Sequence, residues 1–187
     1  FLLSIAVLGR LLFFLLAGQE QSVRFYEVLI AGLIGWLSIF GVCIHFPINY
    51  PIVYVVIVLL PFSALFSPVF RSQCCWQCFT SIKNFSQLLA SINRWHFLVF
   101  VWFVGFVATY ALLPVVLTDD SSYHLSMWTQ LTYRHQYLFD AKTVIWAVSP
   151  FSVDLIHSII SLVTGTNARA SMNLILYILL LAGLWRL

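Results

Sequence analysis

The chain has 187 residues, of which 62% are apolar and only 8% are charged. Soluble domains carry about 25% charged residues, so a soluble domain of this size could not bury so much apolar surface. The formal net charge is +3 without a basic cluster, so we expect no nucleic-acid partner. The apolar runs are continuous and do not alternate, which predicts an all-α, polytopic transmembrane protein.

Three apolar runs at the start of the chain predict membrane-spanning helices. They are Phe1–Ala17, Val28–Phe46 and Ile52–Phe70. A run of about 20 apolar residues crosses roughly 30 Å of hydrocarbon. We expect a tight turn at residues 47–51, where two prolines disfavour helix, and a kink or frayed end at Pro61 and Pro68. Because the chain begins inside an apolar run without an initiator Met, we expect it to be a fragment of a longer protein.

The polar segment from Arg71 to Arg94 carries three basic residues and no acid. Such loops favour the cytoplasmic side of a membrane. Apolar residues at helical spacing indicate that part of this loop lies flat on the membrane. Its three cysteines, Cys74, Cys75 and Cys78, favour inert or acylated thiols over a metal site, since a tetrahedral site needs four ligands.

The run from Trp95 to Leu117 predicts a fourth span, which delivers Asp119 and Asp120 to the outer face. Carboxylates at the mouth of a membrane helix must be solvated, paired or used in chemistry. An aspartate before Ser-Ser-Tyr can cap the start of a helix. A helix needs only one such cap, so capping does not explain the second aspartate. The residues that follow predict an amphipathic helix lying on the membrane. Its apolar side would carry Leu125, Trp128, Leu131 and Leu138.

Four basic or titratable side chains in this outer segment are candidates for neutralising a phosphate group. They are His124, Arg134, His135 and Lys142. Arginine suits phosphate by its planar fork of donors, and lysine acts as a point charge. The alternative interpretation is ordinary solvation at the membrane interface.

The order Leu112-Leu113-Pro114, Asp119 and Tyr123-His124-Leu125 resembles the first outer loop of bacterial GT-C membrane glycosyltransferases. These are relatives of the polyprenyl-phosphate-mannose and aminoarabinose transferases. The resemblance implies that Asp119 is the catalytic carboxylate, with Asp120 in support. The substrate-binding residues that we predict in this segment are Tyr123, His124, Arg134 and Lys142. The partners would be a polyprenyl-phosphate-sugar donor, a lipid or glycan acceptor and membrane lipids. No cofactor is certain, and a divalent metal stays open.

Residues 143–164 predict either a short, partly polar span or an interfacial helix. Asp154 and His157, three residues apart, would share a helical face there. The sequence Gly165-Thr166-Asn167 predicts a break before a last span at residues 170–185. We therefore divide the chain into membrane helices (1–117), an outer loop (118–164) and a further membrane helix (165–187).

The expected function is transfer of a sugar from a lipid-linked donor. The expected location is a bacterial inner membrane, with Asp119 facing the periplasm or the outside. Two other functions stay open. A transporter or flippase would place ionisable residues within spans, of which Arg10 is an example. A non-catalytic membrane assembly subunit would use both acids as helix caps.

Overall fold

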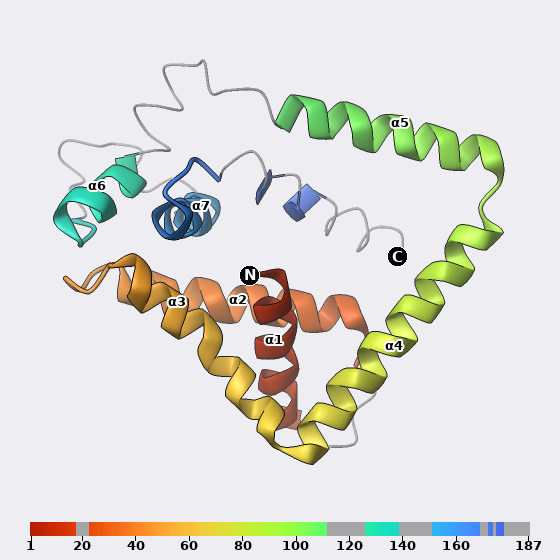
Figure 1. The fold of residues 1–187 in the computed structure, drawn as a ribbon, viewed down its shortest axis with the longest axis horizontal. Coiled ribbons are helices and arrows are strands. Elements are labelled where there is room, and N and C mark those ends of the chain that lie inside the picture. Colours follow the sequence, from red (N-terminus) through yellow and green to blue (C-terminus); the bar gives the residue numbers. More distant parts are fainter. Residues whose placement is uncertain (18–22, 112–125, 139–150, 169–171, 174, 178–187) are drawn as a thin grey trace.

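The computed structural model describes residues 1–17, 23–111, 126–138, 151–168, 172–173 and 175–177 (Figure 1). The described residues are helical with no strand, so the all-α prediction is confirmed. The elements are α1 (Leu2–Ala17), α2 (Phe25–Cys43), α3 (Pro51–Leu59), η1 (Leu60–Phe66), α4 (Pro68–Ser91), α5 (Arg94–Ala111), α6 (Ser126–Arg134) and α7 (Phe151–Thr164).

Helices α1 and α2 cross at two glycines. A Cβ atom on Gly9 would lie 1.8 Å from the carbonyl oxygen of Val28. One on Gly32 would lie 1.9 Å from the carbonyl oxygen of Ile5. Because the neighbouring atoms belong to the backbone and cannot rotate away, the two helices approach this closely only with glycine at both positions. Such contacts between small residues are common where helices pack in lipid.

The predicted turn at residues 47–51 is confirmed in its position. Helix α2 ends at Cys43, residues 44–50 are not helical, and Pro51 is the first residue of α3. Proline is well placed there, because the first N–H groups of a helix have no partner within the helix. The turn therefore brings the end of α2 and the start of α3 to the same end of the molecule.

The predicted third span, Ile52–Phe70, is divided in two. The chain is helical over Pro51–Phe66 and breaks at Ser67, and the helix axis turns by 104° at this break. Ser67 Oγ lies 3.5 Å from the N–H of Phe70, and Pro68 is the first residue of α4. A serine followed by proline is a helix-start signal, so Pro68 begins a new helix instead of fraying the old one.

The predicted polar loop at 71–94 is wrong for most of its length, because α4 runs from Pro68 to Ser91. Residues 69–91 contain neither glycine nor proline, and polar residues alone do not stop a helix. Figure 1 shows α4 leading away from the α1 and η1 corner, and α5 turning back from the far end of α4 across the top of the view. Trp76, Phe79 and Ile82 of α4 are exposed.

Helix α5 is apolar and exposed around its whole circumference. Each residue from Phe97 to Phe103 is between 37% and 69% exposed, and seven consecutive residues make almost two turns. A helix that is apolar on all sides is either buried in protein or placed in a membrane. Among the described residues its one ring contact with a residue outside the helix is Phe103 with Tyr177, at 5.9 Å between ring centroids.

The sequence predicts five membrane spans and leaves a sixth open. The number of described helices that are long and apolar enough for a span is smaller. Within the described ranges, α2 alone is long and apolar enough, and the bent α3–η1–α4 pair adds a second if it counts as one span. Helices α1, α5 and α7 are apolar but contribute only shorter stretches. Residues 112–117 and 178–187, on which two expected spans depend, lie outside the described residues.

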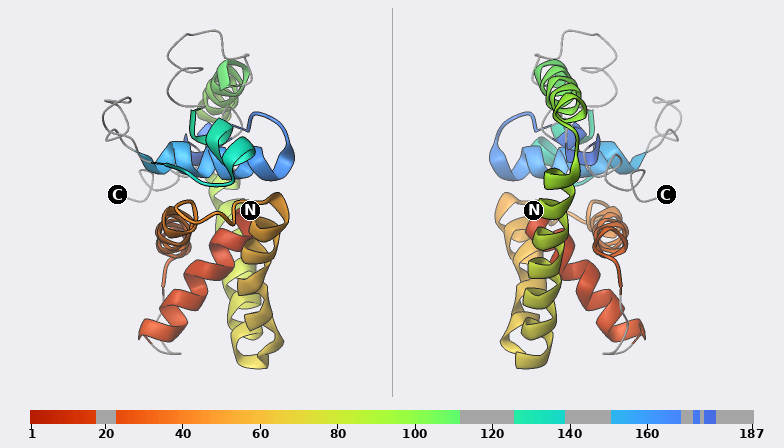
Figure 2. Two further views of the ribbon diagram at one scale, coloured as in Figure 1. Left: turned by 90° about the vertical axis from the view of Figure 1, so that its left-hand side faces the viewer. Right: turned by 90° about the vertical axis from the view of Figure 1, so that its right-hand side faces the viewer.

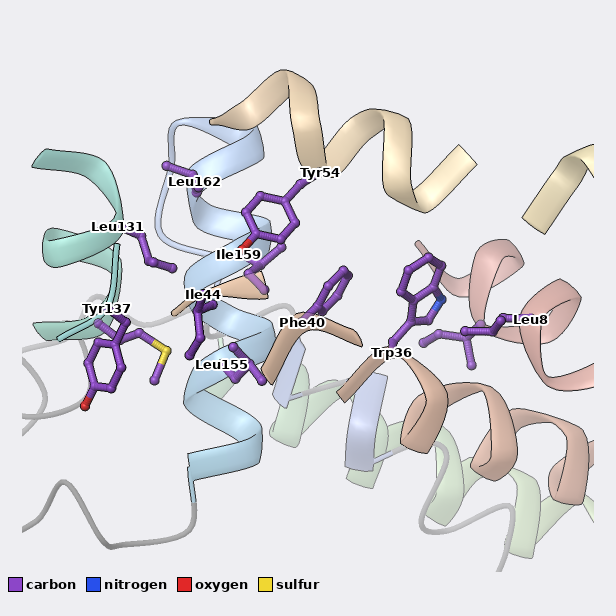
Figure 3. Packing of buried hydrophobic residues seen from close by; sticks show 12 residues of the cluster. Leu8, Trp36, Phe40, Ile44, Tyr54, Leu131, Tyr137, Leu155, Ile159 and Leu162 are labelled. Atoms are coloured by element: carbon purple, nitrogen blue, oxygen red, sulfur yellow. The ribbon is translucent and has the colours of Figure 1, made fainter. Parts of the chain in front are cut away.

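Helix α7 contributes Leu155, Ile159 and Leu162 to the core at the end where α2 meets α3. Its 14 residues extend about 21 Å at 1.5 Å per residue, which is short for a membrane span. Figure 2 shows α6 and α7 against one end of the α1–α3 group, and Figure 3 shows the side chains that fill the space between them. The labelled residues include Phe40, Ile44, Leu131, Leu155 and Ile159, each at most 2% exposed.

Candidate functional site

Most of the predicted site lies outside the described residues. Asp119, Asp120, Tyr123, His124 and Lys142 fall in segments 112–125 and 139–150, and Arg134 is the only predicted site residue that the structure places. The described part of the candidate site therefore consists of residues 126–138 and the residues that they contact.

Helix α6 is amphipathic, as predicted, and its apolar face is buried against protein. Met127 is 4% exposed and Leu131 is fully buried, both in the cluster that includes α7 residues. Trp128 packs against the same cluster. The expectation that this face lies on the membrane is therefore wrong for Leu131, and Met127, which was not predicted to share it, is buried as well. The predicted alignment of Leu138 is also wrong, because the helix ends before it and Leu138 is 48% exposed.

Arg134 stands in the last turn of α6, and its side chain is exposed. The carbonyl end of a helix carries partial negative charge, which stabilises a cation there. The guanidinium of Arg134 is thus presented on the surface by a helix whose opposite face is fixed in the core. This placement is compatible with contact to an anionic group.

His135, a second phosphate candidate, has a different environment. Its φ of 53° is the one positive value among the described non-glycine residues. Its ring stacks on Tyr50 with 4.0 Å between centroids, and its Nδ1 lies 3.3 Å from the carbonyl oxygen of Asn49. His135 is therefore held by the α2–α3 turn, whereas Arg134 next to it is exposed.

Asn49 is the centre of this attachment. It is fully buried, and its side-chain Nδ2 donates to the carbonyl oxygens of Ile44 (3.2 Å), Phe46 (2.6 Å) and His135 (2.7 Å). Its Oδ1 accepts a hydrogen bond from the hydroxyl of Tyr54. The Asn49 N–H also donates to the His135 carbonyl, at 3.3 Å. One side chain therefore shapes the turn and ties it to the segment after α6.

Two further hydrogen bonds extend the attachment. The N–H of Tyr137 donates to the carbonyl oxygen of Ile44 at 2.8 Å, and Gln136 Nε2 donates to that of His45 at 2.7 Å. We call residues 44–50 and 135–138 together the junction. It joins segments about 90 positions apart in sequence, and it fixes the C-terminal end of α6 beside the start of α3.

Asp154 and His157 belong to α7. They stand three residues apart, and His157 is only 4% exposed. Tyr137 of the junction is 7% exposed. Burial, and secondarily the negative charge of Asp154, raises the pKa of the Tyr137 hydroxyl. The phenol therefore stays neutral over a wider range of alkaline pH than an exposed tyrosine would.

No group of three His, Cys, Asp or Glu side chains in the described part of the chain is arranged to hold a metal ion. Cys74, Cys75 and Cys78 are free thiols on α4. Whether Asp119 and Asp120 bind a divalent metal stays open, because both lie outside the described residues. Comparison with known proteins identified no matching family model, no matching curated protein and no matching solved structure.

Sequence reasoning identified the 47–51 turn but not the role of Asn49 within it. The signal in the sequence was an asparagine between two prolines, and asparagine in a turn is ordinarily explained by local backbone bonding. Its bond to His135, 86 positions away, depends on tertiary structure. No local pattern contains that information.

Proposed function

We propose that the chain is a polytopic membrane glycosyltransferase of the GT-C type. It would transfer a sugar from a polyprenyl-phosphate donor to a lipid or glycan acceptor on the outer face of a bacterial inner membrane. The observation that carries the proposal is the series Leu112-Leu113-Pro114, Asp119 and Tyr123-His124-Leu125, which runs directly into α6. The membrane location is supported by α5, which is apolar and exposed on all sides.

The proposed reaction follows from the chemistry of a glycosyl phosphate. The acceptor hydroxyl attacks the anomeric carbon, the bond from that carbon to the phosphate oxygen breaks, and polyprenyl phosphate leaves. Asp119 takes the proton of the acceptor hydroxyl, and Asp120 supports it or caps the following helix. Tyr123 and His124 would contact donor or acceptor, and Arg134 and Lys142 would contact the phosphate that gains charge.

The geometry of α6 supports the role given to Arg134. A phosphate contact is useful only if the guanidinium is held in place while charge develops on the leaving group. Leu131 in the core and His135 in the junction restrain the helix on both sides of Arg134. The exposed guanidinium thus stands on a restrained support.

The test uses the full chain in proteoliposomes with polyprenyl-phosphate-linked mannose and aminoarabinose as donors and a lipid extract as acceptor. We expect Asp119→Asn to lower the rate of polyprenyl phosphate release by at least about 100-fold, since general bases contribute 10²–10⁴. Asp120→Asn should have a smaller effect, because capping is retained by asparagine. Equal rates for wild type and Asp119→Asn would refute the mechanism.

One observation favours a second function, that of a transporter. Arg10 in α1 is 8% exposed and His157 in α7 is 4% exposed, so the chain does bury ionisable groups within helices. In the same proteoliposomes, movement of labelled donor across the bilayer without release of polyprenyl phosphate would support transport and exclude transfer.

A further inference from the structure

Arg10 is a buried cation in the middle of α1. Its side chain is 8% exposed, and its Nη2 donates to Gln73 Oε1 of α4 at 3.0 Å. Its Nε is buried and has no hydrogen-bond partner within the described residues. The guanidinium is planar and positively charged, with donors arranged in a fork.

Arg10 has no counter-charge within the described part of the chain. That part contains two carboxylates, Glu27 and Asp154. Glu27 accepts hydrogen bonds from the N–H of Arg24 and the hydroxyl of Tyr26, and Asp154 lies on α7 and acts on Tyr137. The amide of Gln73 is neutral and offers only a dipole. A buried charge without a counter-charge costs several kcal/mol, so an anion in contact with Arg10 would offset a cost that no described carboxylate offsets.

The contact of α1 with α4 near Arg10 includes an aromatic pair. Phe14, one turn after Arg10, packs edge-on against Phe70, one turn before Gln73, with centroids 5.7 Å apart. The same two helices also expose large apolar side chains. They are Leu15 (68%), Leu16 (84%), Val69 (46%) and Trp76 (72%). An anion that carries long apolar chains is therefore compatible with the outer surface of α1 and α4.

We infer that Arg10 and Gln73 form a binding site for the phosphate of an anionic phospholipid, at the contact of α1 with α4. The guanidinium fork matches the phosphate oxygens and supplies the charge. The Gln73 carbonyl holds the guanidinium in orientation through Nη2. The acyl chains of the lipid lie along the exposed apolar side chains of α1 and α4. This site depends on the proposed membrane location but not on transferase activity.

The test measures lipid preference of the full chain in nanodiscs of neutral phosphatidylcholine, with or without phosphatidylglycerol. Thermal unfolding and lipid adducts in native mass spectrometry are the readouts. We expect phosphatidylglycerol to raise the Tm of wild type and to be retained as an adduct. Arg10→Met, of similar length but uncharged, should lose the Tm increase and weaken retention by about tenfold or more.

Arg71→Met is the matched control, because Arg71 is an exposed cation on the same helix as Gln73. It should keep the full preference for phosphatidylglycerol. If Arg10→Met does not fold, Arg10→Lys keeps the charge without the fork and should show a reduced Tm increase. Gln73→Leu removes the hydrogen bond but not the charge, and should keep a preference for the anionic lipid.

Three results would overturn the site. Wild type could show the same Tm and adducts in both lipids, or Arg10→Met could keep the preference. Alternatively, inorganic phosphate in detergent could raise the Tm as much as the lipid does, which would indicate a soluble anion. Failure of the chain to insert into bilayers would instead contradict the proposed membrane location.

Discussion

At the scale of single residues, Asn49 forms the side-chain hydrogen bonds that shape the junction. Asn49→Leu keeps the volume but removes the side-chain bonds to three carbonyl oxygens and to the Tyr54 hydroxyl. The Ile44 and His135 carbonyl oxygens keep backbone N–H partners, whereas the Phe46 carbonyl oxygen and the Tyr54 hydroxyl lose this one. Each unsatisfied buried group costs about 1–3 kcal/mol, so we expect a loss of about 3 kcal/mol in the free energy of unfolding. Denaturant unfolding in mild detergent measures it.

Tyr54→Phe is the control for Asn49→Leu. It removes one bond to Asn49 Oδ1 and keeps the aromatic packing against Phe40, so about 1 kcal/mol should be lost. A variant Asn49→Leu as stable as wild type would mean that water replaces the lost bonds and that the junction contributes little to stability.

The candidate site shows how much can be predicted from residue types alone. The pattern around Asp119 predicts a chemistry, because it places paired carboxylates, tyrosine, histidine and basic residues in one segment. It did not distinguish Arg134 from His135, which are neighbours and both fit a phosphate. The difference comes from the φ of 53° and the stacking on Tyr50, which position His135 in the junction. Both depend on a turn far away in sequence.

At the scale of helices, the crossing of α1 and α2 at Gly9 and Gly32 is the tightest described contact. Gly9→Ala would place a methyl group where the Val28 carbonyl oxygen now lies, 1.8 Å away. We expect the two helices to move apart and the free energy of unfolding to fall by about 2 kcal/mol. Thermal unfolding in detergent, followed by circular dichroism, measures the change.

Gly105→Ala on α5 is the matched control, because a Cβ atom there meets nothing within 4 Å. It should be neutral, or stabilising by up to about 1 kcal/mol through helix propensity. If both glycine variants behave alike, the close crossing of α1 and α2 is not part of the folded protein.

The helices were predictable to different degrees for physical reasons. Helix α2 was found within three residues at each end, because a long apolar run bounded by polar residues and prolines has one interpretation. The sequence predicts a loop for most of α4, because the segment is polar. Polarity alone does not prevent a helix, and residues 69–91 contain no glycine or proline to end one. Helix α7 stayed ambiguous, because a run with Asp154 and His157 fits an interfacial, buried or spanning helix equally. Its burial is decided by α6, α2 and α3.

At the scale of the whole molecule, the exposed apolar surface is the feature that raises the question of whether hydrocarbon or water surrounds it. Trp102, near the middle of α5, is 69% exposed, whereas Trp36 in the core is 1% exposed. If α5 lies in hydrocarbon, lipids brominated on their acyl chains should quench Trp102 and not Trp36. The fluorescence quenched by these lipids should therefore fall in Trp102→Phe and stay unchanged in Trp36→Phe. Iodide in the aqueous phase should show neither difference, because the ion does not enter hydrocarbon. Quenching of Trp102 by iodide would place α5 in water and would contradict the membrane location on which the proposed function and the lipid site both depend.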